Sequence, residues 1–240
     1  MCIGRENMKI IGSTILIIIG FMATIMLLTR SPALMLLLLI IGAILLKLMK
    51  PSLKGYLGEW YVNYKLKRLG DMYTVFHDLY VPTINGKTTQ VDHIVTSPFG
   101  IYVIETKNYS GWIYGKEYQK YWTQVLYKRK ERLYNPIRQN YGHVRAVTKF
   151  LQLNEGKLHS IIVFSTKAKL KVKGHFTSAH VTTIPKLMKV IKSFDHYIIS
   201  DYELKKINKT LENLKIKGKK ERYFIKKNHR KEVRRKRKFS

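Results

Sequence analysis

The sequence contains a single cysteine, at position 2, so it cannot form an intramolecular disulfide or a zinc site built from cysteines. Acidic residues are also scarce, because 15 Asp and Glu stand against 45 Lys and Arg. Internal repeats and glycine-rich phosphate loops are absent as well. These absences argue against a disulfide scaffold, a repeat protein and a P-loop nucleotide-binding protein.

The formal charge of +30 is spread over three parts of the chain. Residues 1–50 carry +4, residues 51–214 carry +14 and residues 215–240 carry +12. Such a surface favours polyanions, either nucleic acid or anionic lipid, although a generally lysine-rich proteome would produce the same excess. We therefore predict a membrane anchor (1–50), a folded domain (51–214) and a mobile polybasic tail (215–240).

Two apolar runs, residues 10–28 and 33–49, support the anchor. The first has no charged residue and is long enough to cross a bilayer. Basic residues on both outer flanks favour a transmembrane helical hairpin with both ends in the cytoplasm. The alternative is one spanning helix followed by an interfacial or re-entrant one. The hairpin predicts a multi-pass cell-membrane protein whose C-terminal domain is cytoplasmic.

A strand–turn–strand pattern lies at the centre of the folded domain. Residues 89–96 and 101–107 are rich in β-branched and aromatic types, and residues 97–100 read Ser-Pro-Phe-Gly, which is turn chemistry. If the turn pairs Thr96 with Ile101, the numbers of paired residues sum to 197. Asp92 then lies opposite Glu105, and its strand neighbour Gln90 lies opposite Lys107 on the same face.

Two carboxylates placed opposite each other repel unless a cation lies between them. Hard divalent ions such as Mg²⁺ or Mn²⁺ bind one or two carboxylates together with water and substrate phosphate. A lysine one strand step away can orient or deprotonate the attacking water, or neutralise charge on a phosphate. A cross-strand Glu–Lys ion pair on a solvated face is the simpler interpretation of the same pattern.

The rest of the domain alternates helical and strand patterns, which predicts an α/β fold with a mixed central sheet flanked by helices. Residues 128–132 are expected to form a basic link and residues 167–174 a basic loop. In the helix that begins at Asn135-Pro136, Gln139 and His143 lie one turn apart on one face. His143 and His93 are expected to be surface or satisfied histidines. The predicted helices are 54–69, 135–151, 185–194 and 200–214, and the predicted strands outside the central pair are 73–77, 112–115, 121–127 and 160–165.

An ordered set of short motifs runs through residues 54–150. It consists of Gly55-x-x-Gly58-Glu59, Gln90-Val91-Asp92-His93-Ile94, the run from Phe99 to Asn108, Gly111, Trp122 and Asn135-Pro136-x-x-Gln139-Asn140. In this set the chain resembles the nuclease-related domain (NERD) family. Asp92 and Glu105-Thr106-Lys107 match the D…(D/E)xK signature of the restriction-endonuclease-like superfamily.

The resemblance implies a divalent-metal-dependent nuclease that hydrolyses phosphodiester bonds in DNA or RNA. It implies that Asp92, Glu105 and the Thr106 carbonyl bind the ion and that Lys107 acts on the attacking water. Glu59, Gln139 and Gln90 are the supporting candidates. The alternative function is a non-catalytic tether that binds nucleic acid or anionic lipid through its basic surface and tail.

Overall fold

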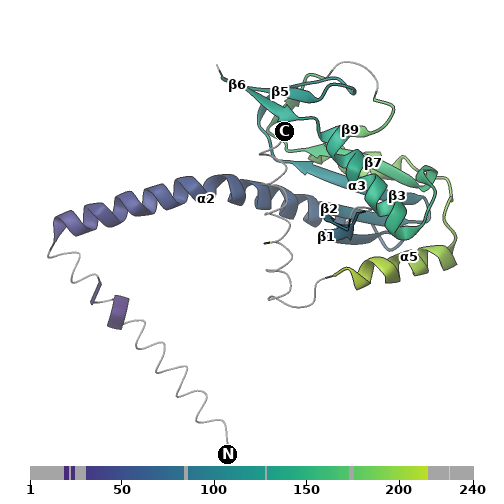
Figure 1. Cartoon of the computed structure of the whole chain (residues 1–240), viewed down its shortest axis with the longest axis horizontal. Coiled ribbons are helices and arrows are strands. Elements are labelled where there is room, and N and C mark those ends of the chain that lie inside the picture. Colours follow the sequence, from purple (N-terminus) through teal and green to yellow (C-terminus); the bar gives the residue numbers. More distant parts are fainter. Residues whose placement is uncertain are drawn as a thin grey trace, which may run out of the picture. The chain divides into compact units, whose positions relative to one another are not determined.

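The computed structural model describes residues 19–21, 23–24, 31–83, 86–127, 129–172, 176–215 and 227 (Figure 1). The chain divides into two compact units, Met1–Leu53 and Lys54–Ser240. The second unit contains both β-sheets. Most of the apolar run 10–28 and nearly all of the tail predicted for residues 215–240 lie outside the described residues.

Helix α2 runs without a break from Pro32 to Leu66, where the sequence predicted two helices separated near Pro51. Proline removes one backbone hydrogen bond, but strong helix formers such as Leu, Met and Lys flank it on both sides, and the helix continues through it. None of the helices within the described residues meets the length and hydropathy needed to cross a membrane. The helical hairpin remains a prediction.

The central sheet has five strands in the order β1-β2-β3-β7-β9. Strands β1, β2 and β3 pair antiparallel, whereas β3, β7 and β9 pair parallel, so the predicted mixed sheet is confirmed. Its strands are β1 (Thr74–Pro82), β2 (Thr88–Ser97), β3 (Gly100–Lys107), β7 (Leu158–Phe164) and β9 (His180–Thr183).

The register predicted for the central pair of strands is also confirmed. Thr96 pairs with Ile101 and His93 pairs with Ile104, so paired numbers sum to 197. The turn closes on Gly100, whose φ of +136° is a conformation that side-chain-bearing residues rarely adopt. Burial on both faces fixes this register, since a slip of one residue would exchange the two faces.

Helices cover both faces of the central sheet. On one face, α3 (Pro136–Leu151) and α5 (Asp201–Asn213) pack on Ile101 and Val103 of β3. On the other face, the C-terminal part of α2 and α4 (Ile184–Lys192) pack on Tyr102 and Ile104. The Ser200 hydroxyl accepts a hydrogen bond from the Glu203 amide and so caps the N-terminus of α5. The 3-10 helix η1 (Glu155–Lys157) leads into β7.

A second sheet, in the order β6-β5-β4-β8, corrects three predictions. Residues 167–174 were expected to form a loop, but Ala168–Leu170 form strand β8. Residues 112–115 and 121–127 were expected in the central sheet, but β2 and β7 already occupy both edges of β3, so the chain leaves that sheet after Lys107. Residues 128–132 were expected to be a link, but most of them belong to a strand whose charged side chains are exposed. The strands are β4 (Gly111–Tyr114), β5 (Tyr121–Leu126), β6 (Arg129–Tyr134) and β8 (Ala168–Leu170).

Candidate active site

The polar cluster begins where β2 and β3 separate. Their backbone pairing ends at His93 and Ile104, so Asp92 and Glu105 are the next residues on the two strands. Asp92 uses its side chain to bridge the gap, because its Oδ2 accepts a hydrogen bond of 2.8 Å from the backbone N–H of Thr106. The predicted opposition of the two acidic residues thus places them at the open end of the hairpin.

Glu105, Lys107 and Gln139 form a closed triangle of charged and polar side chains. Lys107 Nζ lies 2.7 Å from Glu105 Oε1, and Gln139 Nε2 donates to the same oxygen at 2.8 Å. Lys107 also donates to Gln139 Oε1 at 2.9 Å. The side chain of Glu105 is only 4% exposed and that of Lys107 only 15%, so this is not an ion pair on a solvated face. Such a closed set holds each group in one geometry.

Helix α3 positions Gln139 through two buried asparagines. Asn135 caps the helix, since its Oδ1 accepts a 2.9 Å hydrogen bond from the Ile137 amide. One turn later, Asn140 Nδ2 donates to the Val103 carbonyl and to Ser160 Oγ, both at 2.9 Å. These contacts join the helix to β3 and β7, across which it lies in Figure 1. The helix thereby brings Gln139 within hydrogen-bond distance of Glu105.

His143, which sequence reasoning took for a surface or satisfied histidine, lies at the site. It is buried, with Nδ1 2.8 Å from Thr89 Oγ1 and Nε2 3.2 Å from Glu105 Oε2. The contact with Glu105 is within ion-pair distance but lacks hydrogen-bond geometry. The signal in the sequence was its position four residues after Gln139, on the same face of the helix.

Glu59 reaches the cluster because α2 packs closely on the segment after β3. A Cβ atom built on Gly58 would lie 2.8 Å from Cβ of Asn108, so no larger residue fits there. Burial raises the pKa of Asp92 well above its usual range, and the negative charges of Glu105 and then Glu59 raise it further. Glu59 therefore acts on Asp92 electrostatically.

The two carboxyl groups differ in their surroundings. Burial favours a raised pKa for Glu105, but the charge of Lys107 and the contact with His143 outweigh it and lower the pKa below its ordinary value. For Lys107, burial favours a lowered pKa, but the charge of Glu105 outweighs it and raises the pKa. Lys107 is thus protonated and Glu105 ionised at neutral pH.

Gln90 does not join the cluster, which corrects its predicted place opposite Lys107. Pairing of β2 with β3 stops before Gln90 is reached, and Gln90 pairs with Tyr80 of β1 instead. Its Nε2 donates to Asp78 Oδ1 at 2.8 Å. Asp78 has a φ of +54°, and this irregularity in β1 was not visible in the hydrophobic pattern.

The donors present fit a hard divalent cation. Glu105 Oε2 and Thr106 Oγ1 are buried oxygens without a hydrogen-bond partner, and Asp92 and Glu105 repel each other. The described residues contain no cluster of three or more Asp, Glu, His or Cys side chains that could hold a metal. A cation here would therefore rely on two carboxylates, the Thr106 carbonyl, water and substrate oxygens, which is the ligand set typical of Mg²⁺.

Three comparisons relate the chain to known proteins. The family model of the nuclease-related domain matches residues 54–165. An uncharacterized protein of Bacillus anthracis is 37% identical over 163 residues, which are 67% of this chain and 76% of that protein. Among solved structures, the small subunit of the heterodimeric restriction endonuclease R.BspD6I matches with 15% identity and a TM-score of 0.28, over 72% of this chain and 89% of that one. The chain belongs to the nuclease-related domain family.

Proposed function

We propose that the protein is a divalent-metal-dependent nuclease that hydrolyses phosphodiester bonds. The observation that carries this proposal is the closed triangle of Lys107, Gln139 and the buried Glu105 beside Asp92. A tether for nucleic acid needs only exposed cations, and buried carboxylates would repel phosphate. Membership in the nuclease-related domain family supports the same conclusion.

Asp92, Glu105 and the Thr106 carbonyl would hold Mg²⁺ or Mn²⁺. When bound, such an ion offsets the charge of the scissile phosphate and makes water a better nucleophile. Lys107 is protonated and fixed by two acceptors, so it would orient the attacking water and stabilise negative charge on the phosphate. Its raised pKa makes it a poor general base. Gln139 positions Lys107 and Glu105 relative to each other.

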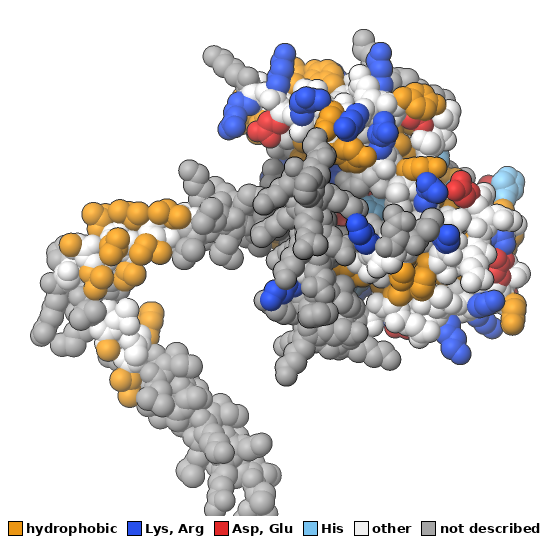
Figure 2. All heavy atoms as spheres, in the orientation of Figure 1, with side chains coloured by type: hydrophobic (Ala, Val, Ile, Leu, Met, Phe, Trp, Pro, Cys, Tyr) orange, Lys and Arg blue, Asp and Glu red, His pale blue; other side chains and the backbone are white. Residues whose placement is uncertain are grey.

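We also propose that the N-terminal unit anchors the protein in a membrane, with the nuclease domain on the cytoplasmic side. The support lies in the surface of α2 before residue 45, where the large side chains are apolar and exposed (Figure 2). A helix with apolar side chains on all sides is unfavourable in water. These exposed residues are Met35, Leu36, Leu37, Leu38, Leu39, Ile40, Ile41 and Ile44.

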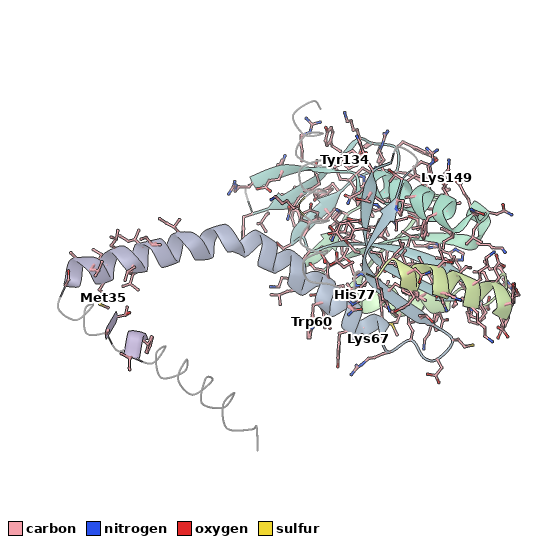
Figure 3. The ribbon with its side chains drawn as sticks, turned by 60° about the horizontal axis from the view of Figure 1, so that its bottom comes forward. Met35, Trp60, Lys67, His77, Tyr134 and Lys149 are labelled. Atoms are coloured by element: carbon pink, nitrogen blue, oxygen red, sulfur yellow. The ribbon has the colours of Figure 1, made fainter. Side chains whose placement is uncertain are left out.

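The test of the nuclease is cleavage of single- and double-stranded DNA and RNA by the full-length protein, with Mg²⁺, with Mn²⁺ and with EDTA. Asp92→Ala should abolish both divalent-ion binding, measured by calorimetry, and cleavage. Glu59→Gln should have an intermediate effect, because the site loses one negative charge that attracts the cation while the ligands Asp92 and Glu105 remain. Lys149→Ala is the matched control, since Lys149 is exposed on the last turn of α3 (Figure 3).

A wild-type protein that binds these substrates but cuts none of them would favour the tether instead. Protease treatment of intact cells tests the anchor separately. The C-terminal part of the chain should remain uncut if the domain is cytoplasmic.

A further inference from the structure

The second sheet has one face that is rich in aromatic and cationic side chains, and we refer to it as the open face. Side chains of paired residues project from the same face of a sheet, so the observed pairs define its members. Trp112 pairs with Val125 and Lys169, and Tyr121 pairs with Tyr134. The complete set is Trp112, Tyr114, Tyr121, Thr123, Val125, Lys130, Arg132, Tyr134 and Lys169.

The opposite face of the same sheet packs into the domain. Ile113, Trp122 and Leu133 are buried there in one hydrophobic cluster. Glu131 pairs with Gln124, which places the only carboxylate of these four strands on that opposite face. The open face therefore contains aromatic rings and three cationic side chains, with no acidic group among its strand residues.

The rings of the open face are accessible. Trp112 is 47% exposed, Tyr114 38% and Tyr134 48%, although burying such rings would stabilise the fold. Arg132 lies over the ring of Tyr121, with its guanidinium carbon 4.3 Å from the ring centre. Figure 2 shows lysine and arginine side chains beside hydrophobic ones at the β5 and β6 end of the domain.

The open face continues toward α3. Tyr134 also lines a cavity of about 520 Å³, which Arg138 and Tyr141 border from the first turns of that helix (Tyr134 is labelled in Figure 3). Glu117 lines the cavity as well, but its carboxylate accepts a 2.8 Å hydrogen bond from the Ser178 amide. The chain enters β4 four residues after Lys107 and enters α3 directly after β6, so the sheet is joined to the candidate active site at both ends.

We infer that the open face binds single-stranded nucleic acid and leads it to the site of cleavage. Rings on adjacent strands offer flat surfaces on which unpaired bases stack, and the cations between them contact phosphates. A base-paired duplex keeps its bases stacked inside and cannot use those rings. An anionic membrane would satisfy the cations, but the open face has only one aliphatic side chain, Val125, to insert into lipid.

This inference rests on the proposed nuclease for the destination of the strand, whereas the binding itself is independent of catalysis. The experiment measures binding of full-length protein to a fluorescent 20-nucleotide single strand and to the matched duplex, in EDTA. The variant combines Trp112→Ala, Tyr114→Ala and Tyr134→Ala. Its control is Tyr202→Ala, because Tyr202 is 82% exposed on α5. A second variant, Trp112→Phe with Tyr114→Phe and Tyr134→Phe, keeps the rings.

We expect the alanine variant to bind the single strand about tenfold more weakly or worse, with little change for the duplex. The phenylalanine variant should retain most of the single-strand binding because it keeps the rings, and the unchanged duplex binding of the alanine variant excludes misfolding as the cause of its loss. Equal losses for single strand and duplex, or no loss at all, would overturn the inference. The inference would also be overturned if the alanine variant still bound the single strand but no longer bound vesicles containing phosphatidylserine.

Cleavage with Mg²⁺ separates the two proposals. If the wild type prefers the single strand in binding but never cuts it, the nuclease fails and the binding surface remains. If the alanine variant cuts single strands as fast as the wild type, the nuclease remains and the surface fails.

Discussion

The two sheets of this domain present polar and charged side chains in opposite ways. At the open end of the central sheet, Glu105 is buried, Lys107 is only 15% exposed, and both bind each other and Gln139. On the second sheet, Lys130 and Arg132 are exposed beside exposed aromatic rings. Both sheets belong to one compact unit, so their burial results from the same fold.

The contrast separates the tasks of a nuclease. Catalytic groups must be held in one geometry and shielded from water, because their electrostatic effect is large only where the surroundings are dry. Groups that grip a flexible polyanion need the opposite, namely exposure and tolerance of many geometries. We therefore expect substitutions at the end of the central sheet to change the rate of cleavage, and substitutions on the open face to change the binding of nucleic acid.

Lys107→Ala should show the largest difference between its effect on cleavage and its effect on binding. Under the proposed function Lys107 stabilises charge on the phosphate, so its removal should lower the rate of cleavage about 100- to 1000-fold. The dissociation constant for nucleic acid in EDTA should stay within about twofold, since Lys107 is not on the open face. Single-turnover cleavage and fluorescence anisotropy measure the two quantities. Equal losses in rate and binding would show that the two sheets are not specialised as proposed.

Asn135→Ala tests the junction between the two sheets. Asn135 is fully buried, caps α3 and donates 2.7 Å hydrogen bonds to the carbonyls of Glu117 and Gln119. Removing the amide leaves those carbonyls unsatisfied and the cap lost, which should cost about 2–3 kcal/mol of unfolding free energy. Urea denaturation checks this value. Asn154→Ala is the control, because its side chain makes no capping hydrogen bond.

Gln139→Leu sharpens the assignment of Gln139 as a positioning residue. Lys107 and Glu105 would remain, but the amide that holds both would be gone, so cleavage should slow about 10- to 100-fold. The pH–rate profile should shift as well, since Lys107 loses an acceptor for its charged form. An unchanged profile with a reduced rate would indicate a purely structural role.

The smallest effect should come from His159, which is remote from the rings of the open face. Burial lowers the pKa of His159. The hydrogen bond with the Phe99 carbonyl raises this pKa in part, and the nearby charge of His180 lowers it again. The unfolded chain then binds more protons than the folded one, so stability falls as the pH drops below about 6.5. His159→Phe keeps a ring in contact with Phe194 and should reduce this loss. Urea denaturation at pH 7.5 and 5.5 measures the difference, and an equal loss in both proteins would contradict the assignment.

Local chemistry in the sequence was sufficient for the hairpin of β2 and β3. A turn of Ser-Pro-Phe-Gly between two β-rich runs permits one register that buries both apolar faces, and that register places Asp92 opposite Glu105. The cap at Asn135 was equally local, because a side-chain acceptor followed by proline marks the start of a helix. Lys107 followed from the hairpin, because it lies two residues after Glu105 on the same face of the strand, whereas Gln139 was a candidate only through the resemblance to the family.

Only the tertiary structure decided which strands share a sheet and which side chains reach the site. The hydrophobic pattern of β4 and β5 is the same in either sheet, but β2 and β7 occupy the edges of β3 and exclude them. Gln90 left the cluster because β2 stops pairing with β3 at His93 and beyond that point pairs with β1 alone. His143 entered it because α3 packs across β3 and β7. Strand order and helix packing depend on contacts between segments far apart in the chain. A one-dimensional pattern of residue types does not specify those contacts.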